Sequence, residues 1–216
     1  MFTDMKKNLF ALIIFIMMTI NGFAQYKPFQ FGLSFSPSIC TTKSNCDIID
    51  NGLTKLSYNW GFKGNFYFVE NYGFSTGFNV LNIRGGHSYE DKTHGKINAV
   101  IKNQYLEFPL SMIMRTERLG KTRIVGNIGY GMGFLLKASQ ENTDSKNKAV
   151  EIDNQFSMVR HALIIKIGAE VNVYKSSCLS AFFVFNNNFS NIYTYDNPFE
   201  HNISMNNLSL EIDFVF

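Results

Sequence analysis

Short segments that alternate between apolar and polar residues recur along most of the chain, and no other feature limits its possible folds so strongly. The clearest is FQFGLSFS at residues 29–36, in which Phe29, Phe31, Leu33 and Phe35 alternate with glutamine, glycine and serine. Successive side chains of a β-strand point to opposite faces, so this period of two residues predicts a strand with one apolar face and one polar face.

The same alternation predicts eight strands. They are expected near residues 29–36, 58–68, 72–83, 100–115, 122–137, 156–173, 179–189 and 208–216. The seventh is the least regular, because Phe182 and Val184 lie on its otherwise polar face. The 22 Phe and 10 Tyr against only 4 Pro favour strands over helices. An all-β protein is therefore expected.

The connections between these segments alternate in length. Short links at residues 69–71, 116–121 and 174–177 alternate with long polar ones at residues 41–55, 85–98, 138–155 and 190–202. Short turns at one end and long loops at the other are typical of outer-membrane barrels, in which the short turns are periplasmic. We predict an eight-stranded antiparallel up-and-down transmembrane β-barrel with short periplasmic turns and long extracellular loops.

The polar faces indicate which side of the barrel is apolar. A soluble barrel such as a lipocalin needs a mostly apolar interior, whereas here the polar faces combine small residues with charges of both signs. Such faces fit a narrow lumen in which buried ions need partners. We expect a lipid-facing exterior and a structural charge network in the lumen, and a secreted lipocalin-like binder is the less favoured alternative. The network is predicted to contain Lys63, Glu107, Arg123, Lys137, Lys166, Glu170, Glu211 and Asp213.

The segment YLEFPLSM places Glu107 and Pro109 in an otherwise apolar strand. Glu107 is expected to point into the lumen and to pair with Lys63, Lys166 or Arg123. Proline cannot donate to a strand ladder, so a bulge or an irregular ladder is predicted at Pro109. In the next strand, Gly129, Gly131 and Gly133 are expected to leave room for bulky interior neighbours such as Tyr105.

The N-terminal residues have the organisation of a secretory signal peptide. Lys6 and Lys7 precede the apolar residues 9–20, and Gly22-Phe23-Ala24 is a small-x-small cleavage site. We therefore predict a signal peptide at residues 1–24, cleavage after Ala24, and an exported barrel domain at residues 25–216. Cys40 and Cys46 are close enough to form a small disulfide loop in an oxidising compartment.

Three segments resemble the Bacteroidetes outer-membrane β-barrel proteins known as PorT-like. They are QYLEFPLSMIMR at residues 104–115, GNIGYGMGFLLKA at residues 126–138 and the C-terminal LSLEIDFVF. The resemblance implies the bacterial outer membrane as the location. It also implies that the alternating last strand and Phe216 form the signal that the barrel-assembly machinery reads. PorT itself is associated with protein secretion, and that role is not transferred to this chain.

All four histidines, His87, His94, His161 and His201, lie on or beside the predicted long loops. Acidic residues lie nearby: Glu90, Asp91, Glu151, Asp153, Asp196 and Glu200. Outer-membrane enzymes use histidine with acidic or serine residues at this end of a barrel, so an enzyme is one alternative. A small ion-conducting pore through the lumen is another. No nucleophile motif supports catalysis, and no motif indicates a cofactor or a metal site.

The sequence thus favours a non-enzymatic outer-membrane barrel with a structural, surface-interaction or secretion-supporting role. Its expected partners are outer-membrane lipid and lipopolysaccharide, the barrel-assembly machinery, and an unidentified protein that binds the extracellular loops. Nucleic acid is excluded as a partner, because a formal net charge of +3 is small and no basic cluster is interleaved with stacking aromatic residues.

Overall fold

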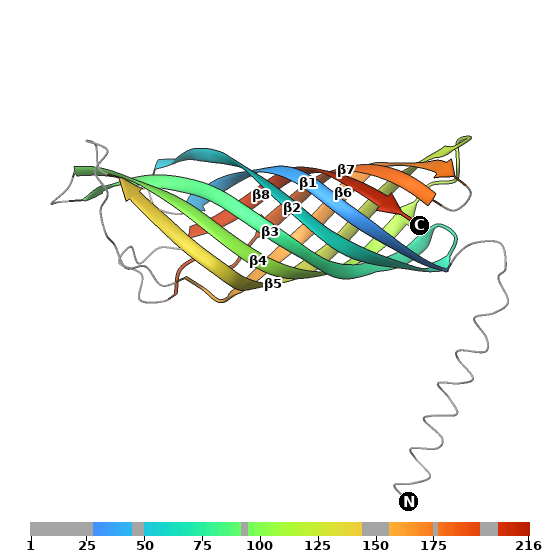
Figure 1. The fold of residues 1–216 in the computed structure, drawn as a ribbon, viewed down its shortest axis with the longest axis horizontal. Helices are drawn as coiled ribbons and strands as arrows, with labels where there is room; N and C mark the ends of the chain where they lie inside the picture. Colours follow the sequence, from blue (N-terminus) through green and yellow to red (C-terminus); the bar gives the residue numbers. More distant parts are fainter. Residues whose placement is uncertain (1–27, 45–49, 92–94, 144–155, 175–176, 195–202) are drawn as a thin grey trace, which may run out of the picture.

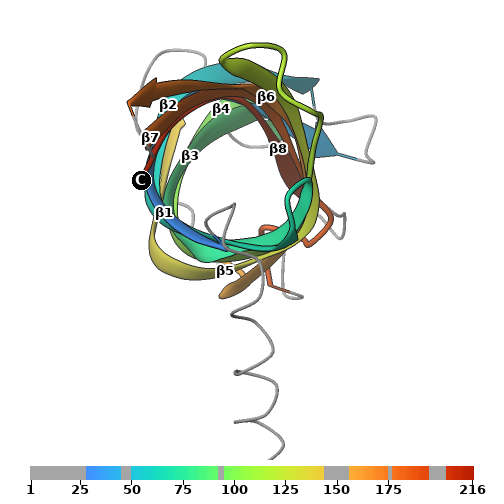
Figure 2. The same ribbon diagram turned by 90° about the vertical axis from the view of Figure 1, so that its right-hand side faces the viewer.

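The protein folds into a closed barrel of eight antiparallel strands, as predicted (Figures 1 and 2). The computed structural model describes residues 28–44, 50–91, 95–143, 156–174, 177–194 and 203–216. The strands are β1 (Phe29–Ser44), β2 (Asp50–Val69), β3 (Tyr72–Asp91), β4 (Gly95–Arg115), β5 (Thr122–Thr143), β6 (Val159–Tyr174), β7 (Ser177–Asn188) and β8 (Ile203–Val215).

Each strand pairs with its neighbours in the sequence, and β1 pairs with β8 to close the ring. Phe31 and Phe216 exchange two backbone hydrogen bonds of 3.1 and 2.8 Å, so the last residue of the chain is part of this closure. A closed sheet leaves no edge of unpaired backbone groups, which is the condition for crossing a bilayer with strands. Among the described residues, no helix has the length and apolar character of a membrane-spanning helix.

The two ends of the barrel differ. The turns between β2 and β3 (residues 70–71) and between β4 and β5 (residues 116–121) lie at one end, together with the start of β1 and the end of β8 (Figure 1). We call this the turn end and the opposite one the loop end. Gly120 has a φ of +67° in the second turn, a conformation that glycine adopts without steric cost. Outer-membrane barrels place their short turns in the periplasm, so the loop end faces outward by this rule.

The strands extend further at the loop end than the sequence predicted. Most of the predicted loops 41–55 and 85–98 and the first part of 138–155 are strand, because β1 continues to Ser44, β3 to Asp91 and β5 to Thr143, while β2 begins at Asp50 and β4 at Gly95. Near the turn end, the large apolar side chains point outward and are exposed, for example Phe31, Phe62 and Leu110. At the loop end this pattern is reversed.

The reversal places an apolar core inside the barrel at the loop end. The core contains Cys40, Leu81, Ile83, Ile97, Ala99, Ile101, Tyr105, Ile192, Tyr193, Ile203 and Met205. Side chains such as Asn82 and Arg84 alternate with this core and point outward. An apolar interior with a polar exterior is what a barrel surrounded by water needs, so the reversal marks the level at which the barrel leaves the lipid.

Pro109 interrupts the ladder on one side, as predicted. The pairing of β3 with β4 proceeds from Thr76 opposite Leu110 to Asn79 opposite Glu107, and the two intervening pairs are missing. On its other side Pro109 pairs with Gly131 in an unbroken ladder. Gly77, in the interrupted part of β3, has a φ of +156°, and a Cβ atom there would lie 2.0 Å from the carbonyl oxygen of Phe62.

Candidate functional site

The interior of the membrane-spanning part contains three groups of charged side chains, and the first lies near the turn end. Arg123 Nε donates to Glu170 Oε1 at 2.8 Å, and Arg115 Nη2 lies 3.5 Å from Glu170 Oε2. Arg115 also donates to Gln30 at 3.1 Å, and its guanidinium carbon lies 3.5 Å from the centre of the Tyr67 ring. One carboxylate thus serves two arginines, and an amide and an aromatic face complete their surroundings.

The second group joins three strands around two carboxylates. Lys166 Nζ, from β6, donates to both carboxylate oxygens of Glu211 on β8, at 2.7 and 2.9 Å. Lys63 Nζ, from β2, donates to Glu211 at 3.0 Å and also to Asp213. The inward positions of β2, β6 and β8 meet here because the barrel is narrow, so the charges neutralise each other across the lumen.

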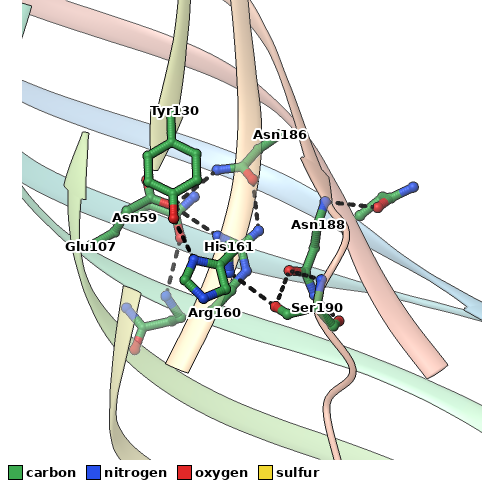
Figure 3. A network of polar contacts seen from close by, with 10 residues as sticks. Asn59, Glu107, Tyr130, Arg160, His161, Asn186, Asn188 and Ser190 are labelled. Carbon is green, nitrogen blue, oxygen red and sulfur yellow. Dashed lines mark hydrogen bonds and ion pairs between the residues drawn. The ribbon is translucent and has the colours of Figure 1, made fainter. Parts of the chain in front are cut away.

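Glu107, Arg160 and Asn186 form the third group, which Figure 3 shows from close by. Arg160 Nη1 donates to Glu107 Oε2 at 2.7 Å, and Arg160 Nη2 donates to Asn186 Oδ1 at 2.6 Å. Asn186 Nδ2 donates to Glu107 Oε2 at 3.3 Å and closes the triangle. Glu107 and Arg160 are only 1% and 2% exposed. This group therefore fixes β4, β6 and β7 to one another through charge-assisted hydrogen bonds.

Apolar side chains fill much of the remaining space between the charged groups. Tyr67, Ile113, Val125, Ile164, Phe182 and Val184 form one interior cluster. A cavity of about 20 Å³ lies among Glu107, Lys166 and Glu211 and their neighbours, and this is room for about one water molecule. The geometry among these groups is that of a packed interior.

The predicted network residues fall into two sets in the structure. Lys63, Glu107, Arg123, Lys166, Glu170, Glu211 and Asp213 lie inside the barrel, and six of them pair within the predicted set. Glu107 does not pair with Lys63, Lys166 or Arg123, because Glu211, Asp213 and Glu170 hold those cations. Its partner is Arg160, which the prediction did not include.

Lys137 was wrongly predicted to face the lumen, and its side chain is exposed on the outside of the barrel. The cause is a register shift in the pairing of β4 with β5. Gln104 pairs with Lys137, whereas Tyr105 pairs with Leu135, so β5 bulges at Leu136. One extra residue reverses which side chains point inward. Leu135 accordingly packs against the interior core, and Lys137 points outward.

The prediction also missed Arg115 and Arg160. Both have the inward parity of their strands, since Arg115 lies eight positions after Glu107 and Arg160 six positions before Lys166. Extending the alternation by steps of two would have found them. Apolar interior residues stand in between, namely Ile113 before Arg115, and Ala162 and Ile164 after Arg160. They interrupt the polar inward face, so the prediction ended that face before it reached either arginine.

A second candidate site lies on the outer face of β5 and β6, where Tyr130 and His161 point toward one another (Figure 3). Their side chains contact through the tyrosine hydroxyl and His161 Nδ1, and the Phe189 ring stacks on the imidazole with ring centres 6.3 Å apart. The Ser190 hydroxyl oxygen accepts a hydrogen bond of 2.9 Å from the backbone N–H of His161. No carboxylate among the described residues contacts His161, so a catalytic triad is not assembled there.

The other predicted candidates have these positions. The side chain of His87 and the whole of His94 and His201 lie outside the described residues, as does the predicted signal peptide. Cys40 is buried and forms no disulfide with another described cysteine. Cys46 is outside the described residues, so its bridge to Cys40 stays a prediction. The described residues contain no group of three or more His, Cys, Asp or Glu that could hold a metal ion. Phe216 lies at the turn end with its side chain exposed.

Comparison with known proteins agrees with this architecture. The profile of a family described as outer membrane protein beta-barrel domain matches residues 23–194. Among solved structures, the outer membrane protein OprG from Pseudomonas aeruginosa is similar, with 8% identity, a TM-score of 0.51, and coverage of 88% of this chain and 97% of that one.

Two further structures have lower scores. Ail, the attachment invasion locus protein of Yersinia pestis, has 12% identity, a TM-score of 0.42, and coverage of 88% of this chain and 100% of that one. Neisserial surface protein A has 10% identity, a TM-score of 0.47, and coverage of 85% and 95%. No curated protein matches the sequence. At such identities the similarity to OprG concerns the fold alone.

Proposed function

The chain belongs to the outer membrane protein beta-barrel domain family, and on that premise we propose that it is a non-enzymatic, non-conducting barrel with a structural and surface-interaction role. It is therefore a protein of the bacterial outer membrane. The observation that carries the proposal is the closed interior, in which five cations face four carboxylates. The cations are Lys63, Arg115, Arg123, Lys166 and Arg160, and the carboxylates are Glu107, Glu170, Glu211 and Asp213.

Buried charges of this kind are better suited to holding strands together than to conducting ions. Each of the four carboxylates pairs with a cation on another strand, and Glu170 and Glu211 each pair with two. An ion that passed through would have to break these pairs in a lumen whose cavity has room for about one water molecule. The interior therefore works as a rigid support, and the surface left for partners is the exterior and the loop end.

The interaction role follows from the shape of the loop end. β3, β4 and β5 extend there around an apolar core (Figure 1), so a rigid, water-exposed platform stands outside the lipid. We propose lipopolysaccharide and other outer-membrane lipid as partners of the exterior, and a protein partner for the platform. A secretion-supporting contact is one form that the partner's binding would take, and Phe216 at the barrel closure is proposed as the assembly signal.

Planar-bilayer recording of the purified full-length protein tests the closed interior. We expect no steady unitary conductance. A variant with the second charged group truncated, K63S/K166S/E211S, serves as the positive control, because removing three long side chains should open a path and show that the protein inserts. A steady conductance of the unaltered protein, equal to that of the variant, would overturn the proposal.

A barrel enzyme is the second candidate, and the contact between Tyr130 and His161 beside Ser190 is the observation that favours it. A histidine, a tyrosine and a serine hydroxyl at the lipid-facing surface are groups that acyl transfer can use. The absence of an orienting carboxylate among the described residues weighs against it. Within this proposal the cluster is structural, with Phe189 stacked on His161 and Tyr130 at the outer surface.

A further inference from the structure

The outer face of β3, β4 and β5 turns from apolar to polar near the loop end, from one outward row of residues to the next. Val80 on β3 pairs with Leu106 on β4, and Leu106 pairs with Phe134 on β5, so these three form an outward apolar row. The next outward positions are polar. They form two rows, with Asn82, Gln104 and Lys137 in the first and Arg84, Lys102 and Ser139 in the second. We call these six residues the polar rows.

Three cations in the polar rows lie close together on adjacent strands. Arg84 is directly opposite Lys102 in the ladder of β3 and β4. Lys137 pairs with Gln104, the outward neighbour of Lys102 on the same strand. Directly opposite residues have Cβ atoms about 5 Å apart and diagonal neighbours about 7 to 8 Å. Lys102 therefore lies beside both Arg84 and Lys137, and an extended headgroup with more than one anionic group can contact all three side chains.

The neighbouring side chains that the structure describes neutralise this charge only in part. Glu141 is the one carboxylate that pairs with the cations in the described residues, and it lies 2.6 Å from Lys102. The amides are bound to one another and to the backbone, because Gln104 donates to Asn82 at 3.0 Å and Asn82 donates to the Tyr58 carbonyl at 3.0 Å. Arg84 and Lys137 are exposed. Like charges opposite each other destabilise a sheet, and a bound anion would offset that repulsion.

The described cations near the loop end lie on β1 to β5, since Lys43 on β1 and Lys55 on β2 accompany the three cations of the polar rows. β6, β7 and β8 carry only two cations, Arg160 and Lys166, and both are buried in the lumen. The outward face of these strands has instead the His161 and Phe189 rings near the same end. A ring of basic residues serving as a general membrane anchor would surround the barrel, whereas a charge on one side favours a localised ligand.

We infer that the polar rows bind the phosphate groups of an acylated lipid of the outer leaflet, with Arg84, Lys102 and Lys137 contacting phosphate and the row of Val80, Leu106 and Phe134 contacting the acyl chains. An amphiphile matches both halves of this surface, which a free anion does not. Arginine offers a planar fork for two phosphate oxygens and lysine a point charge. The inference deepens the proposed interaction role by naming its lipid partner.

Binding of diphosphoryl lipid A to the full-length protein in phosphatidylcholine nanodiscs tests the inference. The variant R84Q/K137Q removes the two cations of the polar rows for which the described residues provide no carboxylate partner, and R118Q/K121Q removes two exposed cations from the turn end as a matched control. Each cation near an anionic lipid surface contributes enough that losing two should weaken binding roughly 30-fold. The control should bind as the unaltered protein does, and the charge-preserving R84K/K137R should retain most of the affinity.

Three results would overturn the inference. The first is equal binding of lipid A from which both phosphates have been removed, since it would assign recognition to the acyl chains. The second is an equal loss in R84Q/K137Q and R118Q/K121Q, since it would reduce the effect to net charge. The third is competition by inorganic pyrophosphate. If it displaced lipid A with the same affinity as the lipid itself, a free anion would be the ligand. These binding measurements are independent of conductance. A barrel that conducts ions but still prefers phosphorylated lipid A would therefore refute the closed interior and leave the lipid site standing.

Discussion

Glu107 and Arg160 lie on either side of Gly133 in one row across β4, β5 and β6. Glu107 pairs with Gly133 in one ladder, and Gly133 pairs with Arg160 in the next. Arg160 reaches across β5 and donates to Glu107 at 2.7 Å. The Glu107 carboxylate lies over Gly131, where a Cβ atom would come within 2.8 Å of Oε2. Glycines on the inner face of β5, Gly131 above all, therefore leave the room in which two buried charges on non-adjacent strands meet.

Removing one member of this pair should destabilise the barrel strongly. E107Q leaves the Arg160 charge without its carboxylate in a site that excludes water, and breaking a buried pair in this way costs about 3 to 5 kcal/mol. The measurement is urea-induced unfolding in lipid vesicles, followed by the fluorescence of Trp60, the single tryptophan of the chain.

The double variant E107Q/R160Q is the control for this prediction. Two neutral amides can hydrogen-bond each other and Asn186, so the double variant should lose less stability than the sum of E107Q and R160Q. Strictly additive losses would show that the two side chains do not act as a pair.

The glycines of β5 differ in how much space they leave, and this difference gives a second prediction. A Cβ atom on Gly131 would lie 2.8 Å from Glu107 Oε2 and from Ile164 Cδ1, whereas one on Gly133 would lie 3.4 Å or more from any neighbour. G131A should therefore lower the free energy of unfolding by about 1 to 3 kcal/mol through overpacking. G133A, measured in the same way, should change it much less. Equal effects would contradict this account of the lumen.

The sequence predicted the membrane-spanning part of the fold well because lipid imposes a simple rule there. Every outward side chain must be apolar, and the alternation of Phe29, Phe31, Leu33 and Phe35 follows directly from it. At the loop end, water surrounds the barrel and the rule reverses. Ile83, for example, points inward there. A prediction that requires apolar residues on the outer face therefore ends each strand before its true end.

The candidate site was less predictable, since local parity does not determine partners. The inward parity of Glu107 was correct, but its partner depends on which strands face each other across the lumen and on the glycine between them. The bulge at Leu136 could not be recognised from the sequence, because Leu135 and Leu136 are both leucine and either one fits the inward or the outward face. The orientation of Lys137 was accordingly missed.

The level at which the barrel leaves the lipid can be tested with matched arginine substitutions. Leu110 points outward in the apolar part of β4 and is 60% exposed, while Asn82 points outward in the polar rows. L110R should cost about 2 to 4 kcal/mol of unfolding free energy if Leu110 lies near the middle of the bilayer, and N82R about 0 to 1. Equal costs in vesicles would mean that the reversal of the pattern is not the lipid boundary.

The outward orientation of Lys137 is open to a chemical test. In a background with Cys40, Cys46 and Cys178 replaced by serine, K137C should react quickly with a membrane-impermeant maleimide on intact cells. N127C, whose parent residue is inward and buried, should react at least tenfold more slowly, on the order of the protection that burial gives a thiol. Fast labelling of N127C together with slow labelling of K137C would instead support the prediction that Lys137 faces the lumen.

The contact between Tyr130 and His161 separates the structural role from the enzymatic alternative. If the cluster only stabilises the outer surface, H161A should lower the free energy of unfolding by about 0.5 to 1.5 kcal/mol, the net value of one hydrogen bond. Cells that express the unaltered protein should then have the same lipid A mass spectrum as cells without it.

S190A removes the hydroxyl that accepts a hydrogen bond from the His161 backbone, and it serves as the matched variant. A loss or gain of an acyl chain that depends on the protein, and that both H161A and S190A abolish while the variants remain folded, would establish acyl transfer chemistry at this surface. The absence of a carboxylate beside His161 among the described residues is the physical reason to expect the first result, since a carboxylate would stabilise the imidazolium that forms when the histidine acts as a general base.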